Sequence, residues 1–304
     1  MKNRFWTGFW RLADPKISLT SVASIYIGAA VAASEAAFSL AWLIMLLVAF
    51  FAIEVAKNAW GDVFDYDSGT DQAVAPEDRT AFSGGKRVLV DNLLTRRQTW
   101  AMAAGFTLVG LAAGAAIVFF REPMAFWIGL VGFVLGWSYH GPPLRLAYRG
   151  LGELDVVVCY GPLIALSTYL VLAHRLSWEV FWLSIPLGLI IAAFLWVNEF
   201  PDYQADRTHN KRNLVVRLGR RRASRILPLI YFAAFAVLSA LPLAGFPNTI
   251  LLGWLAAIPA AYASYQVWRA PDRFHRSTPT QPAALIAFLL YSAGAGSGVL
   301  IATA

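Results

Sequence analysis

The chain has 304 residues, of which 58% are hydrophobic and only 14% are charged, with a formal net charge of +7. A soluble domain usually carries about 25% charged residues, so this composition favours an integral membrane protein. The single cysteine, Cys159, excludes a disulfide framework and a cysteine-based metal site.

The first 16 residues are basic and aromatic, and they lack the apolar core of a cleaved signal peptide. Phe5, Trp6, Phe9 and Trp10 recur at helical spacing beside basic residues. This pattern predicts that residues 1–16 form an interfacial helix on an anionic membrane surface.

Nine apolar runs are each long enough for a membrane-spanning helix, and none alternates with the period of a strand. The predicted spans are residues 17–34, 38–60, 99–120, 124–140, 152–173, 177–199, 225–244, 247–268 and 283–303. We therefore expect an all-α, polytopic membrane protein in which residues 1–304 form a single domain. Nine transmembrane helices are expected to surround a central cavity.

The basic residues are distributed unevenly over the predicted connections. Of the 25 Lys and Arg residues, 22 fall on one side of the nine-span topology. The positive-inside rule then places the N-terminus in the cytoplasm and the C-terminus outside, in the cell's inner (plasma) membrane. Topology thus explains the basic excess, and we expect no nucleic-acid partner. The long polar connections, 61–98 and 200–224, lie on the cytoplasmic side, where we expect the active-site loops and the opening of the cavity.

Two polar segments each place one Asn and two Asp residues on one face of a helix. They are Asn58, Asp62 and Asp65 at the end of the second span, and Asn198, Asp202 and Asp206 at the end of the sixth. Both spans run in the same direction, so the clusters should emerge at the same membrane depth. Clusters of Asp and Asn oxygens suit Mg²⁺, which usually shares its coordination with substrate phosphates. The pattern predicts a magnesium site that joins both motifs to a phosphorylated ligand.

A diphosphate also needs cationic side chains, and Arg can bind phosphate oxygens with two parallel hydrogen bonds. The candidates are Lys86 and Arg87 after a Gly-Gly pair, Arg145 after a Pro-Pro turn, and Lys211 just beyond the second acidic motif. Each can alternatively be read as inner-loop charge that orients the protein in the membrane. His140 is a candidate base.

These segments resemble the UbiA superfamily of intramembrane aromatic prenyltransferases. Within it, the chain looks most like the MenA-type branch, the 1,4-dihydroxy-2-naphthoate prenyltransferases of menaquinone synthesis. The resemblance covers nearly the whole chain and rests on residues 69–71, 83–90, 139–145, 198–206 and 211–219 together with the paired acidic motifs. One departure is Gly61, where the MenA-type motif often has Asn.

The resemblance implies a fold, a reaction and residue roles. The two Asn and four Asp residues of the motifs would hold Mg²⁺ and, through it, a polyprenyl diphosphate. Asp71, which we expect beyond a helix end at Gly69, would help hold the metal or activate the acceptor. Arg87, Arg145 and Lys211 would contact diphosphate oxygens, and Tyr139 would lie near the allylic carbon. The enzyme would transfer the prenyl group to an aromatic acceptor.

Two sets of alternatives remain open. The acceptor of a prenyltransferase could instead be 4-hydroxybenzoate, homogentisate, chlorophyllide or a glyceryl phosphate lipid. From another class, a secondary transporter also carries intramembrane carboxylates. Transporter sites favour the bilayer midplane, whereas the acids here gather at the inner helix ends and only Glu54 lies deeper. This distribution favours the enzyme.

Overall fold

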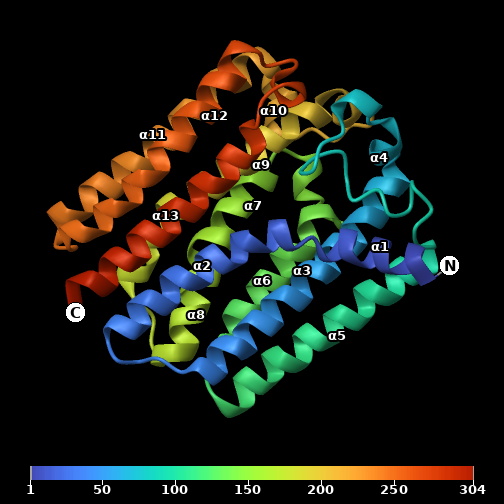
Figure 1. Cartoon of the computed structure of the whole chain (residues 1–304). Helices are drawn as coiled ribbons and strands as arrows, with labels where there is room; N and C mark the ends of the chain where they lie inside the picture. The colour runs from blue at the N-terminus through green and yellow to red at the C-terminus, as the bar shows by residue number, and fades with distance from the viewer. Residues whose placement is uncertain (1, 304) are drawn as a thin grey trace.

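The computed structural model describes residues 2–303, and the regular secondary structure of this part of the chain is all helical, with no strand (Figure 1). The all-α prediction is confirmed. The helices are α1 (Lys2–Ala13), α2 (Pro15–Ser34), α3 (Leu40–Ser68), α4 (Thr70–Ala73), α5 (Arg96–Phe120), α6 (Ala125–His140), α7 (Gly152–Val158), α8 (Ile164–Ala173), α9 (Trp178–Thr208), α10 (Leu214–Leu218), α11 (Arg220–Ala240), α12 (Ala257–Arg269) and α13 (Thr280–Thr303).

Eight helical stretches in the described residues are long and apolar enough to cross a membrane. The segment predicted as the fourth span forms α6, which is apolar but has only 16 residues. Such a helix is about 24 Å long, shorter than a hydrocarbon core of about 30 Å. The count of nine crossings and the side that each end faces therefore stay predictions.

Two helices run well beyond their apolar segments. α3 has 29 residues and continues to Ser68, and α9 has 31 residues and continues to Thr208. Both acidic motifs are therefore helical, as their spacing predicted. Gly69 adopts a left-handed conformation, with φ of 85°, and ends α3 before Asp71, also as predicted.

α9 lies at the centre of the bundle and packs against α7, α11 and α13, while α3 pairs with α5 along its length. In the most apolar stretch of α9, 72% of the residues are buried, compared with 22% in that of α5. The exposed residues of α5 include Leu108 and Phe119, which suits a helix that faces lipid rather than a protein core.

A π-helical turn, η3 (Cys159–Leu163), separates α7 from α8. Pro162 lies within this turn, and Gly161 has non-helical angles of φ −87° and ψ −107°. The Tyr160 carbonyl accepts a hydrogen bond from Ser24 on α2. Turns of this kind occur frequently at functional sites, and this one fixes the position of Tyr160.

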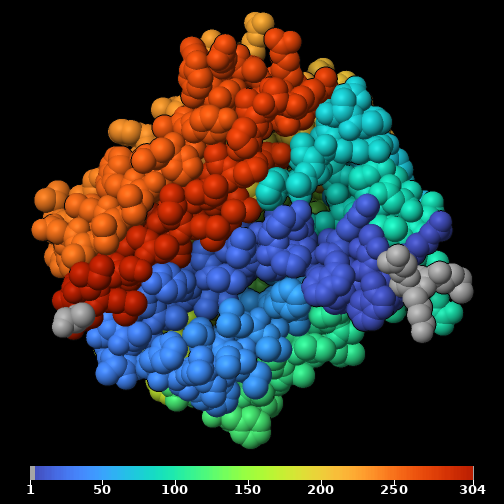
Figure 2. All heavy atoms as spheres, in the orientation of Figure 1, coloured from blue at the N-terminus to red at the C-terminus, as the bar shows by residue number. Residues whose placement is uncertain are grey.

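Residues 74–95, which connect α4 to α5, form a segment that we call the lid. It lies at the same end of the molecule as α1 and α10 (Figure 1). Asp78 of the lid accepts hydrogen bonds from Arg276 and His275, which precede α13. Figure 2 shows the face where the lid, the first two helices and α13 meet, and the surface is hollowed there.

Candidate active site

One large cavity, of about 1450 Å³, lies within the bundle beneath the lid. Its lid end is polar, and its far end is apolar, between α3, α5 and α6. Every residue of the two acidic motifs lines it. Segments about 140 residues apart in the sequence, at the ends of α3 and α9, are thus brought to one space, as the shared direction of the two spans predicted.

Both oxygens of each carboxylate in the first motif accept hydrogen bonds from other groups of the protein. Both oxygens of Asp62 accept backbone N–H groups of the lid, from Val88 and Leu89, each at 3.2 Å. Asp65 accepts the hydroxyl of Tyr148 at 2.6 Å on one oxygen and the ammonium of Lys211 at 2.9 Å on the other. The backbone donors of the lid therefore bind a carboxylate of the protein itself.

The carboxylates of the second motif keep free oxygens. Oδ1 of Asp202 and Oδ1 of Asp206 are buried and have no hydrogen-bond partner. The other oxygen of Asp206 accepts from Asn213 at 2.8 Å, and Asn198 accepts from Gln281 at 3.0 Å. Buried carboxylate oxygens without donors are costly, so these atoms are poised to bind a cation.

Lys211 supplies positive charge between the two motifs. Burial acts to lower the pKa of Lys211, but the carboxylates of Asp65 and Asp206 outweigh it and hold the pKa well above its usual value. The ammonium therefore stays charged at neutral pH, and it lies where the two acidic helix ends approach each other.

Asp71 lies beside the motifs on α4, and its side chain is buried. Burial, and after it the negative charge of Asp65, raise the pKa of Asp71 well above its usual value. Gly85 of the lid has φ of 70°, and a Cβ there would overlap the Asp71 carboxylate, so glycine allows the lid to pack against Asp71 in this conformation. Arg87 donates to the backbone carbonyl of Asp71 at 2.9 Å.

The other predicted residues divide between the cavity and its surroundings. Lys86, Arg87 and Tyr139 line the cavity, although Lys86 is also paired with Asp14 of the segment between α1 and α2. Arg145 does not line it. Its guanidinium lies over the ring of Tyr148, 5.4 Å from the centroid, in a left-handed backbone conformation with φ of 47°.

Sequence reasoning assigned no role to several residues that the structure brings to the site. Tyr148 and Asn213 hydrogen-bond to motif carboxylates. No motif marks Tyr148, whereas Asn213 lies within residues 211–219, a segment that carries the family resemblance. Lys57 and Tyr160 meet on the cavity wall. A lysine inside an apolar span was a signal for the first of them, because such residues are rare unless functional.

The residues at the lid end fit a hard divalent cation by their chemistry. Their free donors are carboxylate oxygens, and the Asn58 side chain uses its amide nitrogen for the Leu12 carbonyl, which leaves its oxygen available. Among residues 2–303, however, no three His, Cys, Asp or Glu side chains come close enough together to hold a metal by themselves. The six-residue magnesium site stays a prediction.

The fold and the cavity define a multi-pass helical membrane protein with an acidic site at one end of its bundle. The family model of the UbiA prenyltransferase family matches residues 21–293, and the chain belongs to that family. It is therefore a prenyltransferase, as the resemblance implied, and the transporter alternative is wrong.

Three relatives show the range of similarity. The chain is 30% identical over 241 residues to UbiA prenyltransferase domain-containing protein 1 of Dictyostelium discoideum, covering 76% of this chain and 70% of the relative. It is 29% identical to 2-carboxy-1,4-naphthoquinone phytyltransferase of Synechocystis, covering 73% and 70%. It is 22% identical to 1,4-dihydroxy-2-naphthoate octaprenyltransferase of Bacillus subtilis, covering 82% and 78%.

Solved structures share the fold. A UbiA homologue from Aeropyrum pernix matches with a TM-score of 0.72 at 19% identity, over 96% of this chain and 98% of that one. A UbiA homologue from Archaeoglobus fulgidus bound to GPP and Mg²⁺ matches with a TM-score of 0.62 at 15% identity, over 96% and 99%.

Proposed function

We propose that this enzyme transfers a prenyl group from an allylic diphosphate to 1,4-dihydroxy-2-naphthoate or a closely related aromatic acid, with Mg²⁺ as cofactor. The observation that carries the proposal is the pair of unpartnered oxygens on Asp202 and Asp206, in a cavity that also holds Lys211. The diphosphate and Mg²⁺ bound to the Archaeoglobus homologue support the donor and the metal. The names of the Synechocystis and Bacillus relatives support the acceptor.

Asp202 and Asp206 would hold the metal through their free oxygens, with the remaining residues of the two motifs beside them. Bound Mg²⁺ supplies positive charge that stabilises the leaving diphosphate. Lys211 and Arg87 add fixed cations at the same end of the cavity, where negative charge grows as the allylic C–O bond breaks.

The apolar depth of the cavity serves the prenyl chain and the reactive carbon. The apolar walls built by α3, α5 and α6 would keep water away from an allylic cation, which water would otherwise quench. The ring of Tyr139 lines the cavity, and its electron-rich face can stabilise a neighbouring cation. The acceptor ring then attacks the allylic carbon, and loss of a proton or of CO₂ restores aromaticity.

The experiment incubates membranes that contain the protein with Mg²⁺, a labelled allylic diphosphate and a panel of acceptors, with and without EDTA. We expect a labelled lipid product with 1,4-dihydroxy-2-naphthoate, and we expect EDTA to abolish it. The panel includes 4-hydroxybenzoate, homogentisate, chlorophyllide and a glyceryl phosphate lipid. A product with one of these in place of the naphthoate overturns the acceptor assignment, and a product that persists in EDTA overturns the metal assignment.

A further inference from the structure

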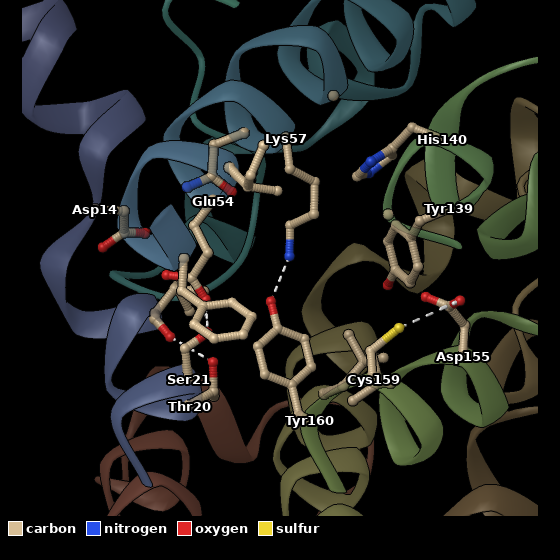
Figure 3. Close-up of a pocket in the computed structure, with 18 of the residues that line it drawn as sticks. Asp14, Thr20, Ser21, Glu54, Lys57, Tyr139, His140, Asp155, Cys159 and Tyr160 are labelled. Atoms are coloured by element: carbon tan, nitrogen blue, oxygen red, sulfur yellow. Dashed lines mark hydrogen bonds between the residues drawn. The ribbon is translucent and has the colours of Figure 1, made fainter. Parts of the chain in front are cut away.

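A lysine lies on the wall of the cavity, deeper than the acidic motifs. Lys57 of α3 donates a hydrogen bond from its ammonium to the hydroxyl of Tyr160 at 2.5 Å, and it lies 5.0 Å from the centroid of that ring (Figure 3). No carboxylate of residues 2–303 forms an ion pair with it within 4.0 Å. Its ammonium is therefore held by a hydroxyl, and the Glu54 carboxylate acts on it only from beyond ion-pair distance.

A carboxylate stands one helical turn further in, on the same face of α3. Glu54 is buried, with 6% of its surface exposed, and it lines the cavity. One of its oxygens accepts from Ser21 on α2, and the other, Oε2, has no partner. Figure 3 shows Glu54 and Lys57 on the same helix, with Tyr160 facing them.

The surroundings make this pair expensive to maintain without a ligand. Charged groups within a membrane span lose their hydration, and an unpaired charge or a free carboxylate oxygen there costs stability. The π-helical turn places Tyr160 opposite Lys57, so backbone irregularity is used to orient the lysine. An anion that met Lys57 and a hydroxyl that met Glu54 would satisfy both groups.

We propose that Lys57 and Glu54 form the subsite for the aromatic acceptor. Lys57 binds the carboxylate of an aromatic hydroxy acid, and the free oxygen of Glu54 accepts a hydrogen bond from a ring hydroxyl. Tyr160 is a positioning residue that holds the lysine toward the cavity. This inference rests on the proposed function for the donor, and it adds the chemical feature by which the acceptor is selected.

The depth of the pair matches this role. Lys57 precedes Asp62 by five residues, which is about 7.5 Å along a helix. The distance between a diphosphate at the acidic motifs and a carboxylate at Lys57 thus leaves space for the allylic carbon and one aromatic ring. Tyr139 and His140 lie across the cavity from Lys57, so the ring would sit between them (Figure 3).

The test compares two acceptors that differ only in the carboxylate, 1,4-dihydroxy-2-naphthoate and 1,4-dihydroxynaphthalene, with purified protein in nanodiscs. In Lys57→Met, we expect KM for the carboxylated acceptor to rise about tenfold to hundredfold, while KM for the uncharged acceptor changes less than about threefold. KM for the allylic diphosphate should stay unchanged. Lys57→Arg should retain most of the preference for the carboxylated acceptor over the uncharged one. The matched control is Lys16→Met, at the mouth of the cavity.

A second measurement does not depend on turnover. Binding of 1-hydroxy-2-naphthoate, followed by its own fluorescence without Mg²⁺ or diphosphate, should weaken in Lys57→Met and stay near wild type in Lys57→Arg. Tyr160→Phe should fall between them, because the ammonium is retained but no longer held.

The outcomes separate the subsite from the proposed function. If KM rises equally for both acceptors in Lys57→Met, or rises for neither, the subsite is overturned even when the wild type prenylates naphthoates. If the wild type prenylates no naphthoate but binds 1-hydroxy-2-naphthoate or 4-hydroxybenzoate through Lys57, the subsite stands and the proposed acceptor fails.

Discussion

The two acidic motifs have nearly the same spacing but different surroundings. At the end of α3, every carboxylate oxygen of Asp62 and Asp65 has a donor from the protein. At the end of α9, Asp202 and Asp206 each keep one buried oxygen without a partner. Carboxylates filled by protein donors fix the lid and the neighbouring helices, whereas those with free oxygens are available to a cation. We infer that the first motif mainly holds the lid and the neighbouring helices in place, while the second motif also offers free oxygens to a cation.

The largest effects should come from exchanging one carboxylate for an amide in each motif. Asp202→Asn and Asp62→Asn should each lower turnover about a hundredfold to a thousandfold, because both remove negative charge from the proposed site for the metal and the diphosphate. Their stabilities should differ. An amide at residue 62 sets its NH₂ against a backbone N–H of the lid, which costs about 1–3 kcal/mol. An amide at residue 202 relieves like-charge repulsion with Asp206, four residues further along α9.

Turnover and the unfolding midpoint, measured on the same detergent-purified preparations, decide between these expectations. Asp62→Asn should unfold several degrees below wild type, and Asp202→Asn at or above it. Equal destabilisation of the two variants would show that the motifs do not differ in the way their hydrogen bonds indicate.

Removal of Lys211 should have the next largest effect. In Lys211→Met, the carboxylates of Asp65 and Asp206 lose the cation between them, and breaking such a buried pair costs about 3–5 kcal/mol. The expected result is a lower unfolding midpoint that Mg²⁺ partly restores, because the metal can replace the lost charge. Lys211→Arg serves as the control. If the unfolding midpoint of Lys211→Met does not change with Mg²⁺, the lysine and the metal do not share a role.

Metal binding itself gives a smaller effect that the second motif should control. Mg²⁺ at a hundred times its dissociation constant stabilises a folded protein by about 2.7 kcal/mol. We expect the unfolding midpoint of the wild type to rise with Mg²⁺, and that of Asp202→Asn to rise little. Asp78→Asn, on the outer edge of the lid, is the control and should respond like the wild type.

The sequence predicted the helical class, the two motifs and their meeting in one cavity, because these follow from hydrophobic run length, helical spacing and span direction. It could not predict which carboxylate oxygens accept hydrogen bonds from the protein and which stay free. That depends on tertiary contacts from the lid, Tyr148 and Asn213, and no motif or spacing says which carboxylate each of these groups reaches. The placement of Arg145 over Tyr148, away from the cavity, likewise arises from a left-handed backbone conformation that no motif specifies.

The smallest effect should come from the outer edge of the lid, which is tied to the segment before α13. Burial acts to raise the pKa of Asp78, but hydrogen bonds from Arg276 and His275 outweigh it and hold the pKa below the usual 3.8. A carboxyl with a lowered pKa contributes stability that is fully present above pH 3.8 and is lost as the pH falls through the folded value.

Asp78→Asn should therefore lower the free energy of unfolding by about 1 kcal/mol at neutral pH, a value reduced from that of a buried pair because solvent reaches Arg276. The difference from wild type should close as the pH falls below 3.8. Glu77→Gln, an exposed neighbour, is the matched control. Because the lid also donates to Asp62, the variant should raise KM for the diphosphate modestly while leaving kcat near wild type. A loss in kcat as large as that of Asp202→Asn would mean that this edge of the lid belongs to the catalytic site rather than to its support.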